Sequence, residues 1–121
     1  MFNKRPNKIL LFLILFFLAL CLQSRTASAT NKILMITDAK CPICVIWEKE
    51  IGRIYPKTDA AKRYPLYRIE IHNYNQRKNS NSIKQNVTPT FIIIENGNEK
   101  GRIIGYSNAE LFWWELDSII E

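Results

Sequence analysis

Apolar residues follow three patterns along the chain, and each pattern predicts a different kind of element. A continuous apolar run occupies positions 9–22 near the N-terminus. Short runs that are apolar throughout, or that alternate with polar residues, are typical of β-strands, and such runs occupy 33–37, 66–71, 90–95 and 101–104. Apolar residues that recur every three or four positions predict helices, and they do so over 42–55 and 108–120.

The four predicted strands differ in how they should be covered. Ile33 to Thr37 is an unbroken apolar run, which predicts a strand buried on both faces. Leu66 to Ile71 alternates apolar with polar residues, which predicts a half-buried strand. Thr90 to Glu95 is rich in β-branched residues and is followed by Asn96-Gly97. This strand and Gly101 to Ile104 are therefore predicted to form a hairpin.

The first predicted helix begins within a pair of cysteines. Pro42 suits the first helical turn, where its missing N–H is no loss, and Pro56 ends the segment. We expect Trp47 to pack in the core, as most aromatic residues at helical spacing do. The apolar residues that recur at helical spacing are Val45 or Ile46, Trp47, Ile51, Ile54 and Tyr55.

The last predicted helix has both a start signal and an apolar face. Ser107 and Glu110 have the spacing of a capping box, which predicts that the helix starts after Ser107. Trp113 and Trp114 are expected to enlarge the packing face. The other residues predicted for that face are Leu111 or Phe112, Leu116, Ile119 and Ile120.

The segment between the second and third predicted strands is polar and rich in asparagine. From His72 to Asn86 the apolar residues are Tyr74 and Ile83. This composition predicts a loop with at most a short helix. His72 is the only histidine of the chain, and we expect it to be solvated or locally hydrogen-bonded rather than to act as an acid or base.

The apolar run at the N-terminus has the flanks of a secretory signal peptide. Lys4, Arg5 and Lys8 precede it, and Ala27-Ser28-Ala29 follows it as an Ala-x-Ala cleavage site. The run is shorter than the ~20 residues needed to span a hydrocarbon layer, which argues against a permanent anchor. A lipid anchor on Cys21 is the alternative.

Leu20 stands before that cysteine, where a lipid-attachment site prefers a small residue. We therefore predict a signal peptide over 1–29, one domain over 30–121 and a periplasmic location. Removal of the signal takes away four of the 17 basic residues and leaves 13 basic against 11 acidic residues. The net charge falls from +6 to near +2, so the basic balance of the whole chain does not indicate nucleic-acid binding. We expect a monomer.

Cys41 and Cys44 are the only cysteines left in the predicted domain. A stapling disulfide is one possibility, but the loop it would close is too short to restrain the unfolded chain. A zinc site would need about four ligands, of which the chain offers these two and one histidine. Covalent haem attachment requires histidine after the second cysteine, where Val45 stands. The spacing favours redox chemistry, without a metal or a separate cofactor.

The predicted position of Cys41 at a helix start supports that chemistry. Unpaired N–H groups and the positive end of the helix dipole stabilise a thiolate over a thiol. Lys40 adds a nearby positive charge. We therefore predict that Cys41 is the nucleophile and that Cys44, one turn further along, is the resolving thiol.

The predicted order of elements is strand, helix, strand, irregular segment, hairpin and helix, with the cysteine pair at the first strand-to-helix turn. The chain resembles the thioredoxin superfamily over essentially all of 30–121. The matching residues are Cys41-Pro42-Ile43-Cys44, Thr88-Pro89-Thr90, Asn96-Gly97, Gly105 and the final helix.

A closer resemblance is to the periplasmic thioredoxin-like SoxS proteins found with bacterial sulfur-oxidation systems. Besides Cys41 to Cys44, the residues that carry this likeness are Trp47, Glu50, Ile54-Tyr55-Pro56-Lys57-Thr58, Pro65-Leu66, Arg68, Thr88-Pro89-Thr90-Phe91, Gly101-Arg102-Ile103, Gly105-Tyr106 and Phe112-Trp113.

The resemblance implies an α/β thioredoxin-like fold, with a central mixed sheet of about four strands flanked by helices. It also implies that Pro89 forms a cis peptide bond and packs against the dithiol. The backbone of Thr88 is then expected to bind an extended substrate segment by strand-like hydrogen bonds. Two departures stand out: Lys40 replaces the tryptophan common before the first cysteine, and Met35 occupies the stretch where thioredoxins place a buried acid.

The resulting hypothesis is a thiol–disulfide oxidoreductase that reduces a periplasmic disulfide-containing protein, such as a sulfur-oxidation carrier. A membrane thiol reductant would donate the electrons. A disulfide oxidase or isomerase is an alternative with the same chemistry and the opposite or neutral electron flow. A dithiol metal module, for copper for example, is a third possibility, although Met or His ligands close to the pair are absent from the sequence.

Overall fold

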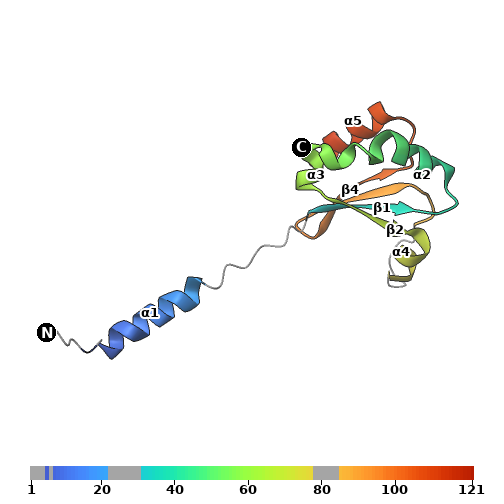
Figure 1. Ribbon diagram of the computed structural model, residues 1–121. Coiled ribbons are helices and arrows are strands. Elements are labelled where there is room, and N and C mark those ends of the chain that lie inside the picture. Colours follow the sequence, from blue (N-terminus) through green and yellow to red (C-terminus); the bar gives the residue numbers. More distant parts are fainter. Residues whose placement is uncertain (1–4, 6, 22–30, 78–84) are drawn as a thin grey trace.

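The computed structural model describes residues 5, 7–21, 31–77 and 85–121. Helices cover both faces of a four-stranded sheet, and a separate N-terminal helix precedes this unit (Figure 1). The strands are β1 (Lys32–Thr37), β2 (Leu66–Glu70), β3 (Thr90–Glu95) and β4 (Asn98–Ile104). The helices and single helical turns are α1 (Lys8–Cys21), α2 (Pro42–Trp47), the π-helical η1 (Glu48–Gly52), the 3-10 turn η2 (Tyr55–Lys57), α3 (Asp59–Arg63), α4 (Ile71–Arg77) and α5 (Ala109–Ile120).

The sheet is mixed and has the strand order β2-β1-β3-β4. β1 and β2 are parallel, whereas β1 with β3 and β3 with β4 are antiparallel. The predicted α/β architecture with about four strands is confirmed. β4 starts at Asn98, three residues before the predicted start at Gly101. Asn96 and Gly97 have φ angles of 51° and 80°, a two-residue turn that lets pairing resume at once.

The pairing register assigns alternate residues to opposite faces of the sheet. Met35 lies opposite Phe91, and Phe91 lies opposite Ile103. These residues belong to the larger core cluster, beneath α2, η1 and α5. Ile36 lies opposite Thr90 and faces the other side, towards α4. We call these two sides the disulfide face and the α4 face, and Figure 1 shows the helices on either side of the sheet.

An aromatic cluster joins the helices of the disulfide face to the sheet. Trp47 is fully buried, as predicted, with its ring centroid 4.9 Å from that of Phe91 and 5.6 Å from that of Phe112. The buried stripe of α2 and the two following turns is Cys44, Trp47, Ile51 and Tyr55. The prediction that Val45 or Ile46, and Ile54, belong to this face is wrong, because these side chains are 50%, 43% and 47% exposed.

The closing helix α5 packs through Phe112, Leu116 and Ile120. The capping prediction is wrong by one residue: Asn108, not Ser107, is the N-cap, and its Oδ1 accepts a hydrogen bond of 2.9 Å from the Leu111 N–H. Both residue types are good caps, and Asn108, whose backbone is extended, is the one that directly precedes the first helical residue, Ala109. Of the alternatives Leu111 or Phe112, Phe112 is the one that packs, whereas the packing prediction for Trp114 is wrong, since its side chain is 66% exposed.

The α4 face is covered by a shorter helix. α4 contributes Tyr74 to a small core cluster with Ile36 and Ile92. The predicted short helix within 72–86 is thus present, and it starts at Ile71, where the second strand was expected to end. His72 is exposed on this helix, and its Nε2 lies 2.9 Å from Gln76 Nε2.

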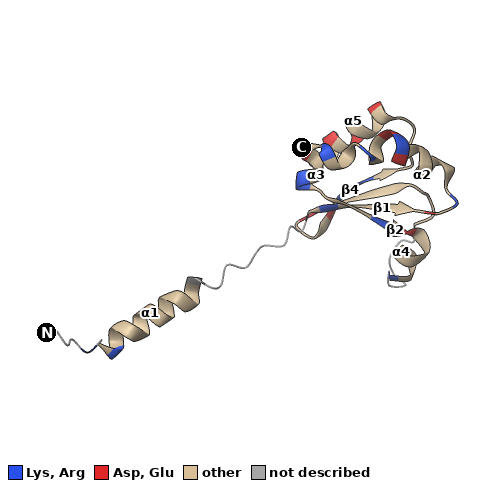
Figure 2. Ribbon diagram, viewed as in Figure 1, with Lys and Arg blue, Asp and Glu red and all other residues tan. Residues whose placement is uncertain are grey.

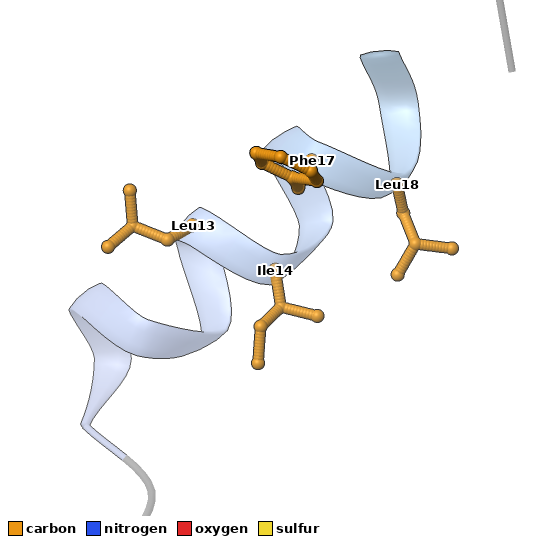
Figure 3. A pocket seen from close by; sticks show the side chains of 4 residues that line it. All are labelled: Leu13, Ile14, Phe17 and Leu18. Atoms are coloured by element: carbon orange, nitrogen blue, oxygen red, sulfur yellow. The ribbon is translucent and has the colours of Figure 1, made fainter. Parts of the chain in front are cut away.

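Helix α1 consists almost entirely of apolar side chains that are exposed to solvent. Its only charged residue, Lys8, lies at its N-terminal end (Figure 2). The shallow hollow along it is lined by side chains of this single helix: Leu13, Ile14, Phe17 and Leu18 (Figure 3). Among the described ranges, we find no helix that combines the length and the apolar character needed to cross a membrane. The predicted cleavage site after Ala29 lies outside the described residues.

Candidate active site

Two cysteines lie at the point where β1 ends and α2 begins. Cys41 and Cys44 are joined by a disulfide bond, with their Cα atoms 5.3 Å apart. A tight turn after β1 leads to them: Asp38 accepts a hydrogen bond of 2.8 Å from the Lys40 N–H at its carboxylate and one of 3.0 Å from the Cys41 N–H at its carbonyl. The turn therefore holds the first cysteine just beyond the C-terminal end of β1.

Cys41 is the N-cap residue of α2. Its Sγ accepts a hydrogen bond of 3.1 Å from the Cys44 N–H, one of the backbone donors that a helix start leaves unpaired. Pro42 occupies the first helical turn, where it removes no helical hydrogen bond. The predicted position of Cys41 at a helix start is confirmed. Donors that point at this sulfur would also stabilise the negative charge of a thiolate.

The two cysteines are both largely buried. As whole residues, Cys41 is 8% exposed and Cys44 is 3% exposed. Both belong to the larger core cluster, which also contains the fully buried Met35. The aspartates and glutamates of the described ranges are all exposed or half-buried. In those ranges, the interior beside the pair is therefore apolar.

The Thr88–Pro89 segment lies at the same end of the sheet as the disulfide. Because β1 and β3 are antiparallel, the end of one meets the start of the other, and Ile36 lies opposite Thr90. The Thr88–Pro89 peptide bond is cis, as predicted. Pro89 is fully buried, and its carbonyl accepts a hydrogen bond of 2.8 Å from the Gly105 N–H.

Thr88 is half-buried, and its backbone makes no hydrogen bond to any other described residue. We expect its N–H and C=O groups to bind an incoming extended chain. The resemblance predicted this role for Thr88, and its use in binding stays a prediction. The same holds for the predicted packing of Pro89 against the dithiol.

A second contact ties the dithiol helix to the chain after β4. The Tyr106 hydroxyl donates a hydrogen bond to the carboxylate of Glu50, which lies in η1. Burial and, after it, the bond to this carboxylate raise the pKa of Tyr106 to about 12. Tyr106 therefore remains a neutral donor at physiological pH. The contact fixes η1, which continues α2, next to the strand end that also binds Pro89.

Sequence reasoning missed one residue of this region, Gln85. Its side chain is buried, and it anchors the segment that leads to Thr88 and Pro89. Gln85 stands in a polar stretch whose composition predicts solvent exposure, so its burial left no signal in the sequence. Within the described residues, no group of three or more His, Cys, Asp or Glu side chains is arranged to hold a metal ion. A site without metal or cofactor stays a prediction.

Comparisons with known proteins agree with this geometry. A family model described as a thioredoxin-like domain matches residues 22–120. Among solved structures, the chain is similar to the periplasmic thioredoxin SoxS from Paracoccus pantotrophus in its reduced form, with 28% identity, a TM-score of 0.63, and 74% of this chain and 95% of that chain covered.

The fold is also similar to that of the Malassezia sympodialis thioredoxin Mala s 13, with 13% identity, a TM-score of 0.59, and 75% of this chain and 78% of that chain covered. No curated protein sequence matches the chain. The family model covers most of the chain, and the strand order and the cysteine pair at the start of α2 agree with it. The chain therefore belongs to the thioredoxin-like family.

Proposed function

We propose that this protein is a thiol–disulfide oxidoreductase that reduces disulfide bonds of a periplasmic protein. The observation that carries the proposal is the Cys41–Cys44 disulfide, in which the sulfur of Cys41 caps a helix. A disulfide that closes so short a loop contributes little to folding, which favours a chemical role over a structural one.

The proposed reaction starts from the reduced dithiol. The Cys41 thiolate attacks one sulfur of the substrate disulfide, forms a mixed disulfide and expels the other substrate sulfur as a thiolate. Cys44, after losing its proton to solvent, then attacks Cys41 Sγ and releases the second substrate thiolate. Two electrons pass to the substrate, and the Cys41–Cys44 disulfide forms. An external dithiol donor, which we expect at the membrane, must reduce it again.

Similarity to a periplasmic SoxS thioredoxin favours a substrate from sulfur oxidation, such as a carrier protein with an essential cysteine. The apolar helix α1 with its preceding cations supports export, with a signal peptide over 1–29. Export is tested by mass spectrometry of the protein from the periplasm. A chain that starts at residue 30 is expected, and an intact N-terminus on a cytoplasmic protein would contradict the proposed location.

The substrate proposal is tested with a Cys44→Ser variant. This variant keeps the nucleophile but lacks the thiol that releases the product, so it should hold periplasmic substrates as mixed disulfides. The matched control is Cys41→Ser with Cys44→Ser, which should hold none. Capture of no periplasmic protein by the single variant would refute the reductase reading.

The direction of electron flow is tested by equilibrating the protein in glutathione or dithiothreitol buffers of known potential. A reductase is expected to have a potential near that of thioredoxin, about −270 mV. A potential close to about −120 mV, as in strongly oxidising periplasmic proteins, would instead support the oxidase alternative.

A further inference from the structure

A buried polar network lies next to the Thr88–Pro89 segment. Gln85 and Thr90 are the buried polar residues of the described ranges, with 7% and 0% exposure. Their side chains are bonded to each other: Gln85 Nε2 donates a hydrogen bond of 2.9 Å to Thr90 Oγ1. Buried polar groups need partners, and here the two residues flank the proposed substrate-binding segment.

The donors and acceptors of the network have fixed directions. Arg102 Nη1 lies 3.0 Å from Gln85 Oε1, and because a guanidinium can only donate, the amide oxygen must face Arg102. The amide nitrogen then faces Thr90. The Thr90 hydroxyl has one proton, and it donates this proton to the Val87 carbonyl over 2.8 Å. Gln85 Nε2 approaches the same carbonyl at 3.4 Å.

The backbone of Gln85 is held as well. Asn75 on α4 accepts a hydrogen bond of 2.8 Å from the Gln85 N–H and donates one of 2.9 Å to the Gln85 carbonyl. The segment from 85 to 89 is thus attached to α4 at one end and, through the Pro89 carbonyl, to Gly105 directly after β4 at the other. Val87 is fixed between these ends, directly before Thr88.

We propose that Gln85 is a positioning residue for substrate binding: by donating to Thr90, it directs the hydroxyl proton to the Val87 carbonyl and so sets the plane of the peptide that precedes Thr88. This inference rests on the proposed function, in which the free backbone groups of Thr88 pair with an extended substrate. According to this inference, residues on the α4 face contribute to substrate binding, although they take no part in the thiol–disulfide exchange itself.

The test compares two substrates that differ in the need for backbone pairing. Reduced protein is mixed with an extended peptide that carries a disulfide, and separately with 5,5′-dithiobis(2-nitrobenzoate), a small disulfide without a peptide backbone. The quantity measured is the ratio of the two second-order rate constants. Loss of stability alone would not change this ratio, because both reactions use the same Cys41 thiolate.

The first variant is Gln85→Glu. A carboxylate still accepts from Arg102 but donates nothing to Thr90, so the Thr90 proton is drawn away from Val87. We expect the peptide-to-small-disulfide ratio to fall about three- to tenfold, the range for one hydrogen bond of typical strength. The matched control is Gln76→Glu on the exposed side of α4, which should leave the ratio unchanged.

A second pair of variants keeps the test valid if Gln85→Glu folds poorly. Thr90→Val removes the hydroxyl without changing the shape of the side chain and should lower the ratio, whereas Thr90→Ser keeps the hydroxyl and should restore it. An unchanged ratio in both Gln85→Glu and Thr90→Val, including one that results from an equal loss on both substrates, would overturn the inference. If the unaltered protein reduces neither substrate, the proposed function itself fails.

Discussion

The two faces of the sheet hold the two halves of the candidate site by different means. On the disulfide face, Cys41 and Cys44 are embedded in a large apolar cluster built around Trp47. On the α4 face, the core among the described residues is small, and hydrogen bonds from Gln85 and Asn75 hold the segment that leads to Thr88. Apolar packing surrounds the disulfide, whereas the segment that leads to Thr88 is held mainly by hydrogen bonds.

The two kinds of interaction contribute differently to stability and to the orientation of groups. Apolar burial contributes about 25 cal/mol per Å² and has no direction, so it stabilises the disulfide face without orienting particular groups. A hydrogen bond contributes only about 1 kcal/mol but constrains both distance and angle. We therefore expect substitutions on the disulfide face to affect mainly the free energy of unfolding, and those in the Gln85 network to affect mainly substrate discrimination.

The largest expected effect comes from Trp47→Ala. Trp47 is fully buried against Phe91 and Phe112, and the loss of a large core side chain typically costs about 3–5 kcal/mol. Chemical denaturation of the oxidised protein measures this value. Trp114→Ala is the control, because Trp114 is 66% exposed, and we expect a change within about 0.5 kcal/mol. Equal losses in the two variants would contradict the assignment of the core.

Two adjacent residues allow a direct comparison of the faces. Ile93 belongs to the cluster on the disulfide face and Ile92 to the cluster on the α4 face, and both are buried. Within the usual range for such truncations, we expect Ile93→Ala to cost about 4 kcal/mol and Ile92→Ala about 2 kcal/mol. Urea denaturation of both variants measures the two losses in the free energy of unfolding. The comparison of faces breaks down if Ile92→Ala proves the more damaging change.

A smaller effect is expected at the start of α5, which covers the disulfide face. Asn108→Ala removes the side chain that accepts from the Leu111 N–H and should lower the free energy of unfolding by about 1 kcal/mol. Ser107→Ala should change it by less than about 0.5 kcal/mol, because Ser107 is exposed and does not cap the helix. A larger loss in Ser107→Ala than in Asn108→Ala would instead support Ser107, the cap predicted from the sequence.

The smallest effect depends on pH. Glu95 accepts a hydrogen bond of 2.6 Å from the hydroxyl of Tyr64, a member of the cluster on the disulfide face, and pairs with Lys100 at 3.1 Å. These contacts lower the pKa of Glu95 below its ordinary value of 4.5. A carboxyl with a lowered pKa in the folded state stabilises the fold above its ordinary pKa, and this contribution is lost as the pH falls through the folded value.

Thermal unfolding of Glu95→Gln should therefore show a slightly lower Tm than the unaltered protein at pH 7. The two Tm values should converge as the pH falls below 4.5. Glu110→Gln, at an exposed position in the first turn of α5, serves as the control. A Tm difference that is the same at all pH values would show that the charge of Glu95 is not responsible.

The elements themselves were predictable, because each depends on local pattern. The hairpin followed from Asn96-Gly97, whose positive φ angles suit those residue types. The start of α2 followed from Pro42, and the place of Cys41 followed from it. The buried side of α2 was predicted less well. The buried side of this helix includes Cys44. Because Cys44 was interpreted as a redox residue, the predicted apolar face started one or two residues later, at Val45 or Ile46.

The polar part of the site was not predictable in the same way. Gln85 is buried because Asn75, Thr90 and Arg102 satisfy its polar groups, and these partners come from α4, β3 and β4. Only the folded arrangement brings them together. Composition instead predicts exposure for such a residue, since an unpaired amide is costly to bury.

The pairing of β1 with β3 also limits how this protein can vary. Side chains alternate along a strand, so a slip of one residue in the pairing would move every side chain of β3 to the opposite side. Phe91 would leave the sulfur-bearing cluster, and Thr90 would turn away from Gln85. Insertions that lengthen surface connections are tolerable in such a molecule, whereas a single inserted residue within β3 would disrupt both the cluster around the disulfide and the Gln85 network.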